Sequence, residues 1–296
     1  MCGIAGIFNF DGSPVKSSQV KSMTLKLAHR GPDNMGLWVK KNIGFGHRRL
    51  SIRDLTAAGN QPMLDPSGRV VVVFNGEIYN YEKLKQELEI KHGCVFRTST
   101  DTEIITVGFP IWGAELFKKL EGMFAIALWD RKGEQLYLTR DSLGIKPLYL
   151  YEDSTKTFFA SEIKAFSKDI EIKLSPASIH TYLAAGYPGP SSTLIEKVRQ
   201  LEPGSIEIFS KRGNSKVKFW QPRRSGEIKS LQEAIEEFKN ILPTVVSEHM
   251  LSDVPVGIFQ SGGIDSTLVS LSLKKMGIMP PLFTASFSEK THDEST

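Results

Sequence analysis

The stretch Met1-Cys2-Gly3-Ile4-Ala5-Gly6-Ile7-Phe8 opens the chain and joins a chemically special position to a strand-forming run. Removal of Met1 would leave Cys2 with a free α-amine. The ordinary pKa of such an amine is about 7.7 to 8.0, so near neutral pH it can accept the thiol proton. A nucleophile and its base then share one residue. A cysteine at position 2 has no such meaning in most proteins, so the rest of the chain must supply the context.

Length and composition describe a chain with room for two domains. The 296 residues are 40% hydrophobic and can bury a sizeable core. Thirty-seven basic and 33 acidic side chains leave a formal charge of +4 without a long basic run, which argues against nucleic acid as a partner. Apolar runs such as Val70–Phe74 are far shorter than the roughly 20 residues of a membrane span. We therefore expect neither a nucleic-acid nor a membrane partner.

The cysteine content indicates the compartment. Cys2 and Cys94 are the two cysteines, too few for a disulfide framework, and the start lacks the pattern of a secretory signal. We therefore expect a cytoplasmic protein, and we interpret Cys94 as an ordinary buried thiol.

Short β-branched and aromatic runs, separated by Gly, Pro, Asn and Asp, extend from Ile4 to about Phe209. This pattern is typical of a strand-rich α+β domain. Strands are expected at residues 4–8, 44–47, 70–74, 124–129, 135–139, 147–151 and 158–160. Helices are expected at residues 18–27, 102–112 and 81–92, the last one ending at Gly93.

The chain changes character after a stretch rich in Lys, Arg, Gly, Ser and Pro at residues 211–229, where we expect a domain boundary. Residues 230–252 then resemble a helix with Ser230 as its N-cap. Pro243 lies inside this helix, so a kink or two shorter helices are expected there.

The remaining residues predict one βαβ unit with parallel strands. Its parts are a buried strand at 256–259, a helix at 264–276 closed by Gly277, and a strand at 282–287.

Four polar motifs follow the opening, in the order His29-Arg30-Gly31-Pro32-Asp33, Gly46-His47-Arg48-Arg49-Leu50-Ser51-Ile52, Asn75-Gly76-Glu77-Ile78-Tyr79-Asn80 and Ser99-Thr100-Asp101-Thr102-Glu103. Behind Cys2, this series resembles the glutaminase domain of class II glutamine amidotransferases, which are N-terminal-nucleophile enzymes. The resemblance covers about the first 200 residues. Segments 140–149 and 160–165 support the identification more than they indicate chemistry. The resemblance implies a sandwich of two antiparallel sheets flanked by helices.

The resemblance also implies a role for individual residues in the hydrolysis of the glutamine γ-amide. Cys2 is the nucleophile, and the Asn75 side-chain amide and the Gly76 backbone N–H form the oxyanion hole. Arg49 holds the substrate carboxylate, Glu77 and Asp101 face its ammonium group, and Arg30 orders the loop around the nucleophile. Taken singly, Asn75-Gly76 is most often a tight turn, Arg49 a surface cation and Asp101 a helix cap. Their joint occurrence behind Cys2 favours the catalytic interpretation.

A second motif, Ser261-Gly262-Gly263-Ile264-Asp265-Ser266, joins the expected strand to the expected helix, where backbone donors can bind phosphate. It lacks the lysine of the Walker pattern and resembles the SGGxDS loop of ATP pyrophosphatases. That resemblance implies that Ser261, Gly262, Gly263, Asp265 and Ser266 contact the pyrophosphate of ATP or its Mg²⁺. No side-chain metal site is expected.

A glutaminase domain followed by this loop resembles the glutamine-hydrolysing asparagine synthetase family. The resemblance implies a glutaminase domain at residues 1–212, a linker at 213–229 and an incomplete synthetase domain at 230–296, an α/β segment like the adenine nucleotide α-hydrolases. In a complete protein, ATP would activate aspartate, and ammonia from glutamine would convert it to asparagine. Because the chain stops at Thr296, we expect it to support only the glutaminase half-reaction. A fragment, a premature stop and one subunit of a split enzyme all fit the sequence.

Other functions stay open at this point. Related amidotransferases act on a sugar acid or a peptide acceptor, and a non-catalytic remnant could bind glutamine, as a homodimer or with a complementing chain. Glucosamine-6-phosphate synthase and the purine amidotransferase share the first domain but lack the pyrophosphatase loop, so residues 261–266 argue against both.

Overall fold

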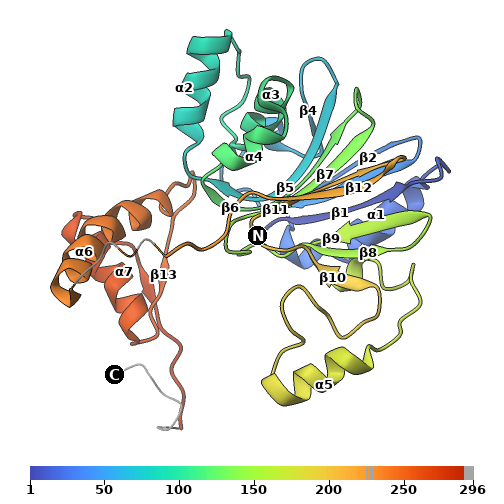
Figure 1. Ribbon diagram of the computed structural model, residues 1–296. Helices are drawn as coiled ribbons and strands as arrows, with labels where there is room; N and C mark the ends of the chain where they lie inside the picture. Colours follow the sequence, from blue (N-terminus) through green and yellow to red (C-terminus); the bar gives the residue numbers. More distant parts are fainter. Residues whose placement is uncertain (225, 227–229, 290–296) are drawn as a thin grey trace. The chain divides into compact units, whose positions relative to one another are not determined.

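A computed structural model describes residues 1–224, 226 and 230–289 (Figure 1). The chain divides into two compact units, Met1–Gln221 and Pro222–Thr296. The first unit contains two six-stranded sheets in which neighbouring strands run antiparallel. The predicted fold class, a sandwich of two antiparallel sheets flanked by helices, is confirmed.

The first sheet has the strand order β10-β8-β9-β1-β3-β2. Its strands are β1 Gly3–Asn9, β2 Asn34–Lys40, β3 Ile43–Arg49, β8 Tyr149–Glu152, β9 Lys156–Ala160 and β10 Val198–Gln200. The second sheet has the order β12-β11-β7-β6-β5-β4. Its strands are β4 Met63–Leu64, β5 Val70–Ile78, β6 Gly122–Asp130, β7 Gln135–Arg140, β11 Ser205–Ser210 and β12 Gly213–Lys218.

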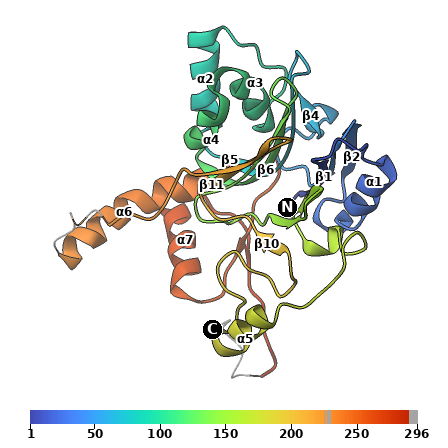
Figure 2. The same ribbon diagram turned by 45° about the vertical axis from the view of Figure 1, so that its right-hand side comes forward.

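Alternation of side chains along β1 and β5 builds the layers of this unit. Successive residues of a strand point to opposite faces, so each strand contributes to two cores. Ile4 of β1 and Val71 of β5 share the core between the two sheets, whereas Ile7 packs against α1 and Val72 against the helices that cover the second sheet. Residues 4–8 of β1 and 70–74 of β5 are apolar because both faces of these strands are covered. Figure 2 shows these layers from a second direction.

Helices cover the outer face of each sheet. These helices are α1 Ser17–Leu25, α2 Tyr81–His92, α3 Thr102–Trp112 and α4 Leu116–Lys119, and α5 Pro176–Ala185 lies in a long connection (Figure 1). The bounds of α2 and α3 agree with the sequence prediction, and Gly93 ends α2 in the left-handed conformation that favours glycine. Cys94, predicted to be buried, is only partly buried against the core beneath these helices.

Several elements escaped the sequence prediction, and exposure explains why β12 and α5 did. All six residues of β12 are exposed, and they lie at the edge of the second sheet, within the predicted linker at 213–229. An edge strand of this kind has no apolar face and shows no alternation. Helix α5 likewise has no buried residue. The strands β2, β4, β10 and β11 were missed as well.

The second unit contains α6 Leu231–Glu248, β13 Ile258–Phe259, α7 Ile264–Lys275 and β14 Leu282–Phe283. Strands β13 and β14 pair in parallel, so the predicted βαβ unit is confirmed, although both strands are shorter than expected. The prediction of two shorter helices is wrong, because α6 continues through Pro243. A proline removes one backbone donor, and here the turns on either side keep their own hydrogen bonds.

The predicted burial of strand 256–259 is also wrong, because Phe259 is 88% exposed. In the described part of this unit, the buried side chains are Val246, Ser272 and Leu273. The described part of this unit therefore leaves most of its apolar side chains at least partly exposed. Among the residues that the structure describes, no helix combines the length and the apolar character needed to cross a bilayer.

Candidate active site

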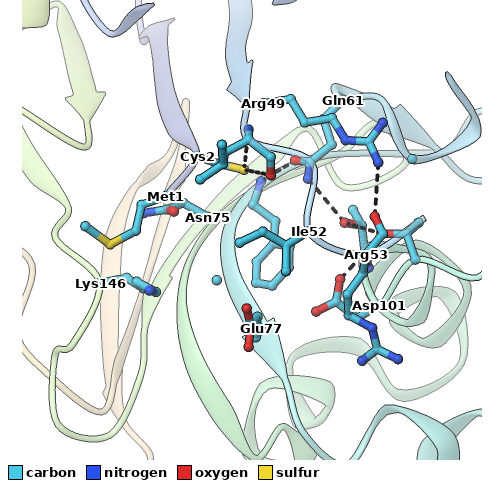
Figure 3. A pocket seen from close by; sticks show the side chains of 16 residues that line it. Met1, Cys2, Arg49, Ile52, Arg53, Gln61, Asn75, Glu77, Asp101 and Lys146 are labelled. Atoms are coloured by element: carbon cyan, nitrogen blue, oxygen red, sulfur yellow. Dashed lines mark hydrogen bonds between the residues drawn. The ribbon is translucent and has the colours of Figure 1, made fainter. Parts of the chain in front are cut away.

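A pocket opens beside the start of β1 and the end of β5 (Figure 3). Six residues singled out from the sequence line it, although they are spread over almost 100 positions. They are Cys2, Arg49, Asn75, Gly76, Glu77 and Asp101. Strand β1 positions Cys2, β3 ends at Arg49, β5 carries the next three residues, and Asp101 immediately precedes α3. The antiparallel pairing of β1 with β3 and the packing of the two sheets bring these strands to one edge of the sandwich.

Cys2 lies partly buried against the backbone of Leu50. The Leu50 N–H donates to Cys2 Sγ at 3.5 Å, and Sγ is 3.7 Å from the Leu50 carbonyl oxygen. Burial raises the pKa of the Cys2 thiol, while the contact with Leu50, the terminal ammonium group and Arg49 lower it. Burial also lowers the pKa of the Met1 α-ammonium group, and Arg30 and Lys146 lower it further. The surroundings therefore favour a neutral Cys2 thiol and a neutral Met1 amine, whereas the Cys2 nitrogen is part of a peptide bond as long as Met1 is present.

Asn75 supplies an unused hydrogen-bond donor in the pocket wall. Its Nδ2 atom is buried and has no hydrogen-bond partner among the described residues, and Asn75 as a whole is 1% exposed. A buried donor without a partner is rare in folded proteins and requires an explanation. An oxyanion that forms only during reaction would be such a partner.

Gly76 fits a place where no side chain is possible. A Cβ atom at this position would lie 2.1 Å from the Met123 carbonyl oxygen and 2.7 Å from the Phe124 Cα atom on neighbouring β6. These backbone atoms cannot retreat without disrupting the pairing of β5 with β6. Glycine therefore allows the β5 backbone to form this part of the pocket wall.

Arg49 is more deeply engaged than the sequence indicated. Its Nη1 donates to the Thr56 carbonyl oxygen at 2.6 Å and to Asn60 Oδ1 at 2.9 Å. Its Nη2 donates to the carbonyl oxygens of Arg53, at 3.1 Å, and Asp54. The guanidinium group thus holds the segment 50–60 beside the pocket, and Nε–H is left as its donor without a partner among the described residues. A role in carboxylate binding stays a prediction.

Asp101 and Arg53 form the opposite side of the pocket. Asp101 is 4% exposed, and its Oδ2 accepts a hydrogen bond of 2.9 Å from the Ile78 N–H. Burial raises the pKa of Asp101, whereas that hydrogen bond and the charge of Arg53 lower it. The Arg53 guanidinium group lies 4.9 Å from the centre of the Tyr81 ring. Glu77, the other predicted acidic residue, follows Gly76 on β5 and lines the same pocket.

The pocket lining also contains residues that were not singled out from the sequence, among them Arg53, Gln61 and Lys146. Gln61 links two elements, because its Oε1 accepts from the Phe74 N–H at 2.6 Å and its Nε2 donates to Thr102 Oγ1 at 3.2 Å. Lys146 lies on the Met1 side of the pocket (Figure 3) and is 6% exposed. Burial lowers the pKa of Lys146, and Glu77 opposes that shift. Lys146 could have been found from the sequence, because it lies in segment 140–149, which resembles a family segment.

Arg30 does not line the pocket, but it contacts the backbone of Cys2. Its Nε donates to the Cys2 carbonyl oxygen at 3.0 Å. The ordering role of Arg30 stays a prediction.

In the second unit, residues 261–266 join β13 to α7 as expected. Gly262 adopts a φ of 80°, and Gly263 is the N-cap of α7 without a side-chain cap. Ser261 Oγ accepts from the Gly263 N–H at 3.3 Å, and Ser266 Oγ donates to the Gly263 carbonyl oxygen at 3.1 Å. The two serines therefore shape the turn, and the uncapped first turn of α7 carries Asp265. A helix start of this kind has free backbone N–H groups, which commonly bind phosphate in proteins, and phosphate binding here stays a prediction.

No group of three or more His, Cys, Asp or Glu side chains that could hold a metal ion occurs in the described part of the chain. The sequence motif associates Asp265 with the Mg²⁺ of ATP, and this role of Asp265 stays a prediction.

The fold and the pocket define an N-terminal-nucleophile amidotransferase. Residues 1–220 match the family described as "Glutamine amidotransferase domain", and residues 237–296 match the family described as "Asparagine synthase". The chain belongs to the glutamine amidotransferase family, in the group with the glutamine-hydrolysing asparagine synthetases.

Curated relatives agree with this assignment. Asparagine synthetase [glutamine-hydrolyzing] 1 of Bacillus subtilis is 35% identical over 99% of this chain and 47% of its own length. A putative asparagine synthetase of Methanocaldococcus jannaschii is 34% identical over 100% of this chain and 61% of its own length. Amidase chry2 of Gibberella zeae is 34% identical over 91% of this chain and 42% of its own length. The chain therefore spans about half the length of the curated relatives it matches.

Solved structures support the fold. The glutamine phosphoribosylpyrophosphate amidotransferase from B. subtilis aligns with a TM-score of 0.56 and 18% identity, over 100% of this chain and 69% of that chain.

Proposed function

We propose that the chain hydrolyses glutamine to glutamate and ammonia at Cys2, and that the whole protein uses this ammonia to convert ATP-activated aspartate to asparagine. The unpaired, buried Asn75 Nδ2 beside Cys2 carries the first part of the proposal, because a donor kept without a partner suits a charge that develops only in the transition state. The family relationship carries the second part.

The proposed reaction begins once Met1 has been removed. The α-amine of Cys2 takes the thiol proton, and the thiolate attacks the γ-carboxamide carbon of glutamine. Asn75 Nδ2 and the Gly76 N–H hold the resulting oxyanion. Collapse breaks the carbon–nitrogen bond, and the α-ammonium group returns its proton to the departing ammonia. Water then attacks the thioester and releases glutamate and the thiol.

Substrate selection is proposed to act at the amino-acid end of glutamine. Arg49, through its Nε–H, would bind the carboxylate, and Glu77 and Asp101 would face the ammonium group. Both charged groups are absent from a glutamine side chain within a protein, so this arrangement favours free glutamine.

The second unit is proposed to begin an ATP site. Ser261, Gly262, Gly263 and Ser266 would place backbone and hydroxyl groups around a pyrophosphate at the α7 N-terminus, and Asp265 would face its Mg²⁺. ATP, when bound, supplies the group that activates the carboxylate of aspartate. A homodimer or a complementing chain is proposed for assembly, in the cytoplasm, where two unpaired cysteines suit a reducing environment.

A different acceptor is the second candidate. The similarity to Amidase chry2 shows that chains of this kind are not confined to proteins named asparagine synthetase. A sugar acid or a peptide would then receive the ammonia, while the glutaminase chemistry would be unchanged.

The first experiment combines intact mass with a glutaminase assay on the 296-residue chain, with glutamine but without aspartate or ATP. Loss of Met1 together with ammonia release is the expected result. Retained Met1 and no ammonia would instead indicate a non-catalytic glutamine-binding remnant, because acylation of the Cys2 amine removes the proposed base.

Replacement of Arg49 by alanine is expected to raise the Michaelis constant for glutamine about tenfold while changing the turnover number less. The same substitution removes the hydrogen bonds that hold segment 50–60 and leaves the buried Asp54 carbonyl oxygen and the partly buried carbonyl oxygens of Arg53 and Thr56 without this donor. A loss of about 3 kcal/mol in unfolding free energy is therefore also expected. Steady-state kinetics and urea unfolding would measure the two effects. A fall confined to the turnover number would mean that Arg49 acts on the reacting end instead.

Replacement of Lys146 by methionine is expected to shift the acid limb of the pH profile of kcat/KM to higher pH. The Lys146 cation, like Arg30, lowers the pKa of the Met1 ammonium group, and Asp33 raises it. Once Met1 is removed, the same charges are expected to act on the ammonium group of Cys2, the next residue. Removing the Lys146 charge therefore raises the pKa of the α-ammonium group, and a larger fraction of the base is protonated near neutral pH. Activity should fall at about pH 6.5 and recover at high pH. Lys40→Met, an exposed change on β2, is the control; an equal fall at every pH would contradict this electrostatic role.

A further inference from the structure

Glu162 lies at the centre of a charged cluster behind the nucleophile. Its Oε1 is 2.8 Å from His29 Nε2 and 3.1 Å from Arg30 Nη1, and its Oε2 is 3.1 Å from Lys164 Nζ. The Glu162 side chain is 26% exposed and that of Arg30 is 9% exposed. Burial opposes the charge of Glu162, but hydrogen bonds from His29, Arg30 and Lys164 outweigh it and lower the pKa of Glu162 to about 2. The carboxylate is therefore ionised throughout any practical assay.

Arg30 transmits the position of Glu162 to the nucleophilic residue. One edge of its guanidinium group contacts Glu162, while Nε donates to the Cys2 carbonyl oxygen at 3.0 Å. The Nη2 atom is buried without a partner in the described chain, so the two contacts just named are the ones that orient the group. Without the Glu162 carboxylate, the Arg30 guanidinium group would lose the charge-assisted hydrogen bond that fixes its orientation.

Ser161, the residue before Glu162, is hydrogen-bonded to the backbone of Ile4 in β1. Ser161 Oγ accepts from the Ile4 N–H at 3.0 Å, and the Ser161 N–H donates to the Ile4 carbonyl oxygen at 2.9 Å. Ser161 is fully buried, and it follows β9, which pairs with β1. Residues 161 and 162 thus fix two consecutive parts of the segment that begins at Cys2.

We propose that Glu162 is a positioning residue for glutamine hydrolysis, which acts through Arg30 to hold the Cys2 carbonyl and so aims Sγ at the substrate carbon opposite the Asn75 and Gly76 donors. The inference rests on the proposed glutaminase function. Glu162 itself does not line the pocket, so it changes the reaction only by fixing Arg30. Misplacement of a reacting group by about 1 Å can cost a hundredfold in rate, which is why a residue outside the pocket can matter.

A simple surface ion pair is the alternative explanation of the cluster. Exposed pairs contribute little to stability, and their loss leaves kinetic constants unchanged. The two explanations therefore differ in the turnover number and in the dependence of that number on Arg30.

The test is a double-mutant cycle on the full chain with Glu162→Ala, Arg30→Met and the double variant, each checked for Met1 removal by intact mass. Glu162→Ala should lower kcat about tenfold and change the Michaelis constant for glutamine by less than twofold. In the Arg30→Met background, the same change should alter kcat by less than twofold. Glu162→Gln keeps an oxygen that can accept from Arg30 and should retain an intermediate rate.

Two controls separate positioning from damage to the fold. Glu152→Ala removes a comparable carboxylate, paired with Arg199 at 3.4 Å, and should leave kcat unchanged. The rate at which iodoacetamide modifies Cys2 should stay within twofold in Glu162→Ala, because a small reagent requires the thiolate but not its alignment.

The outcomes are distinct. Multiplicative effects of the two changes, or normal kcat in Glu162→Ala with an active wild-type chain, would overturn this inference alone. An inactive, processed wild-type chain would overturn the proposed function, and this inference with it.

Discussion

Replacement of Cys2 by alanine is expected to abolish ammonia release from glutamine and to leave the fold intact. The substitution removes the proposed nucleophile and the α-amine cannot replace it. The sulfur atom contacts the Leu50 backbone, but Cys2 precedes β1 and belongs to none of the three hydrophobic cores. Its loss therefore should not open a large cavity. Ammonia release below 0.1% of the wild-type rate, with an unchanged circular dichroism spectrum, is the expected measurement, on the order expected for loss of a catalytic nucleophile.

Cys94→Ala is the matched control, because Cys94 lies against a hydrophobic core outside the pocket. It should retain full turnover. Residual hydrolysis in Cys2→Ala that survives further purification would reject the covalent mechanism, and equal losses in both variants would point to a general thiol effect.

Replacement of Asn75 by alanine is expected to lower kcat at least 100-fold and to change the Michaelis constant for glutamine only a few-fold. A single oxyanion donor typically contributes about 10²–10³ in rate, and the contact is made chiefly in the transition state. Because Nδ2 has no partner in the described chain, its removal also relieves a buried unpaired donor. The melting temperature should therefore stay the same or rise, while activity collapses.

Asn80→Ala provides the opposite pattern. Asn80 Nδ2 donates to the Lys119 carbonyl oxygen at 2.8 Å and its Oδ1 accepts from the Glu121 N–H at 3.1 Å, and Asn80 does not line the pocket. This variant should lose stability but keep kcat. If Asn75→Ala instead raised only the Michaelis constant, the Asn75 amide would be a ground-state contact with the substrate.

The sequence was sufficient for the sandwich and for most of the pocket lining. The apolar runs at β1 and β5 are unambiguous because both faces of these strands are buried. Cys2, Arg49, Asn75, Gly76, Glu77 and Asp101 could be found because each lies in a motif, and the structure places all six in one pocket. Their catalytic roles are still predictions.

Other parts depend on contacts between distant segments and could not be predicted. Lys146 and Gln61 enter the pocket from loops, and the link from Glu162 to Cys2 spans 160 positions and passes through Arg30. The local pattern of apolar and polar residues contains no information about contacts between such distant segments. The exposure of Phe259 was missed for the converse reason, since an apolar run indicates a strand but not whether anything covers it.

The two walls of the pocket differ in how easily they can move. Asn75, Gly76 and Glu77 belong to a ladder in which β5 pairs with β6 without interruption from Val70 to Ile78, so this wall opens only when β5 separates from β6. The facing wall is the segment 50–60, tied down chiefly by one guanidinium group. A local opening of the pocket is therefore expected on the Arg49 side. Such an opening would leave the proposed oxyanion donors Asn75 and Gly76 in place, so the energetic cost of admitting a substrate would be separated from the accuracy of the chemistry.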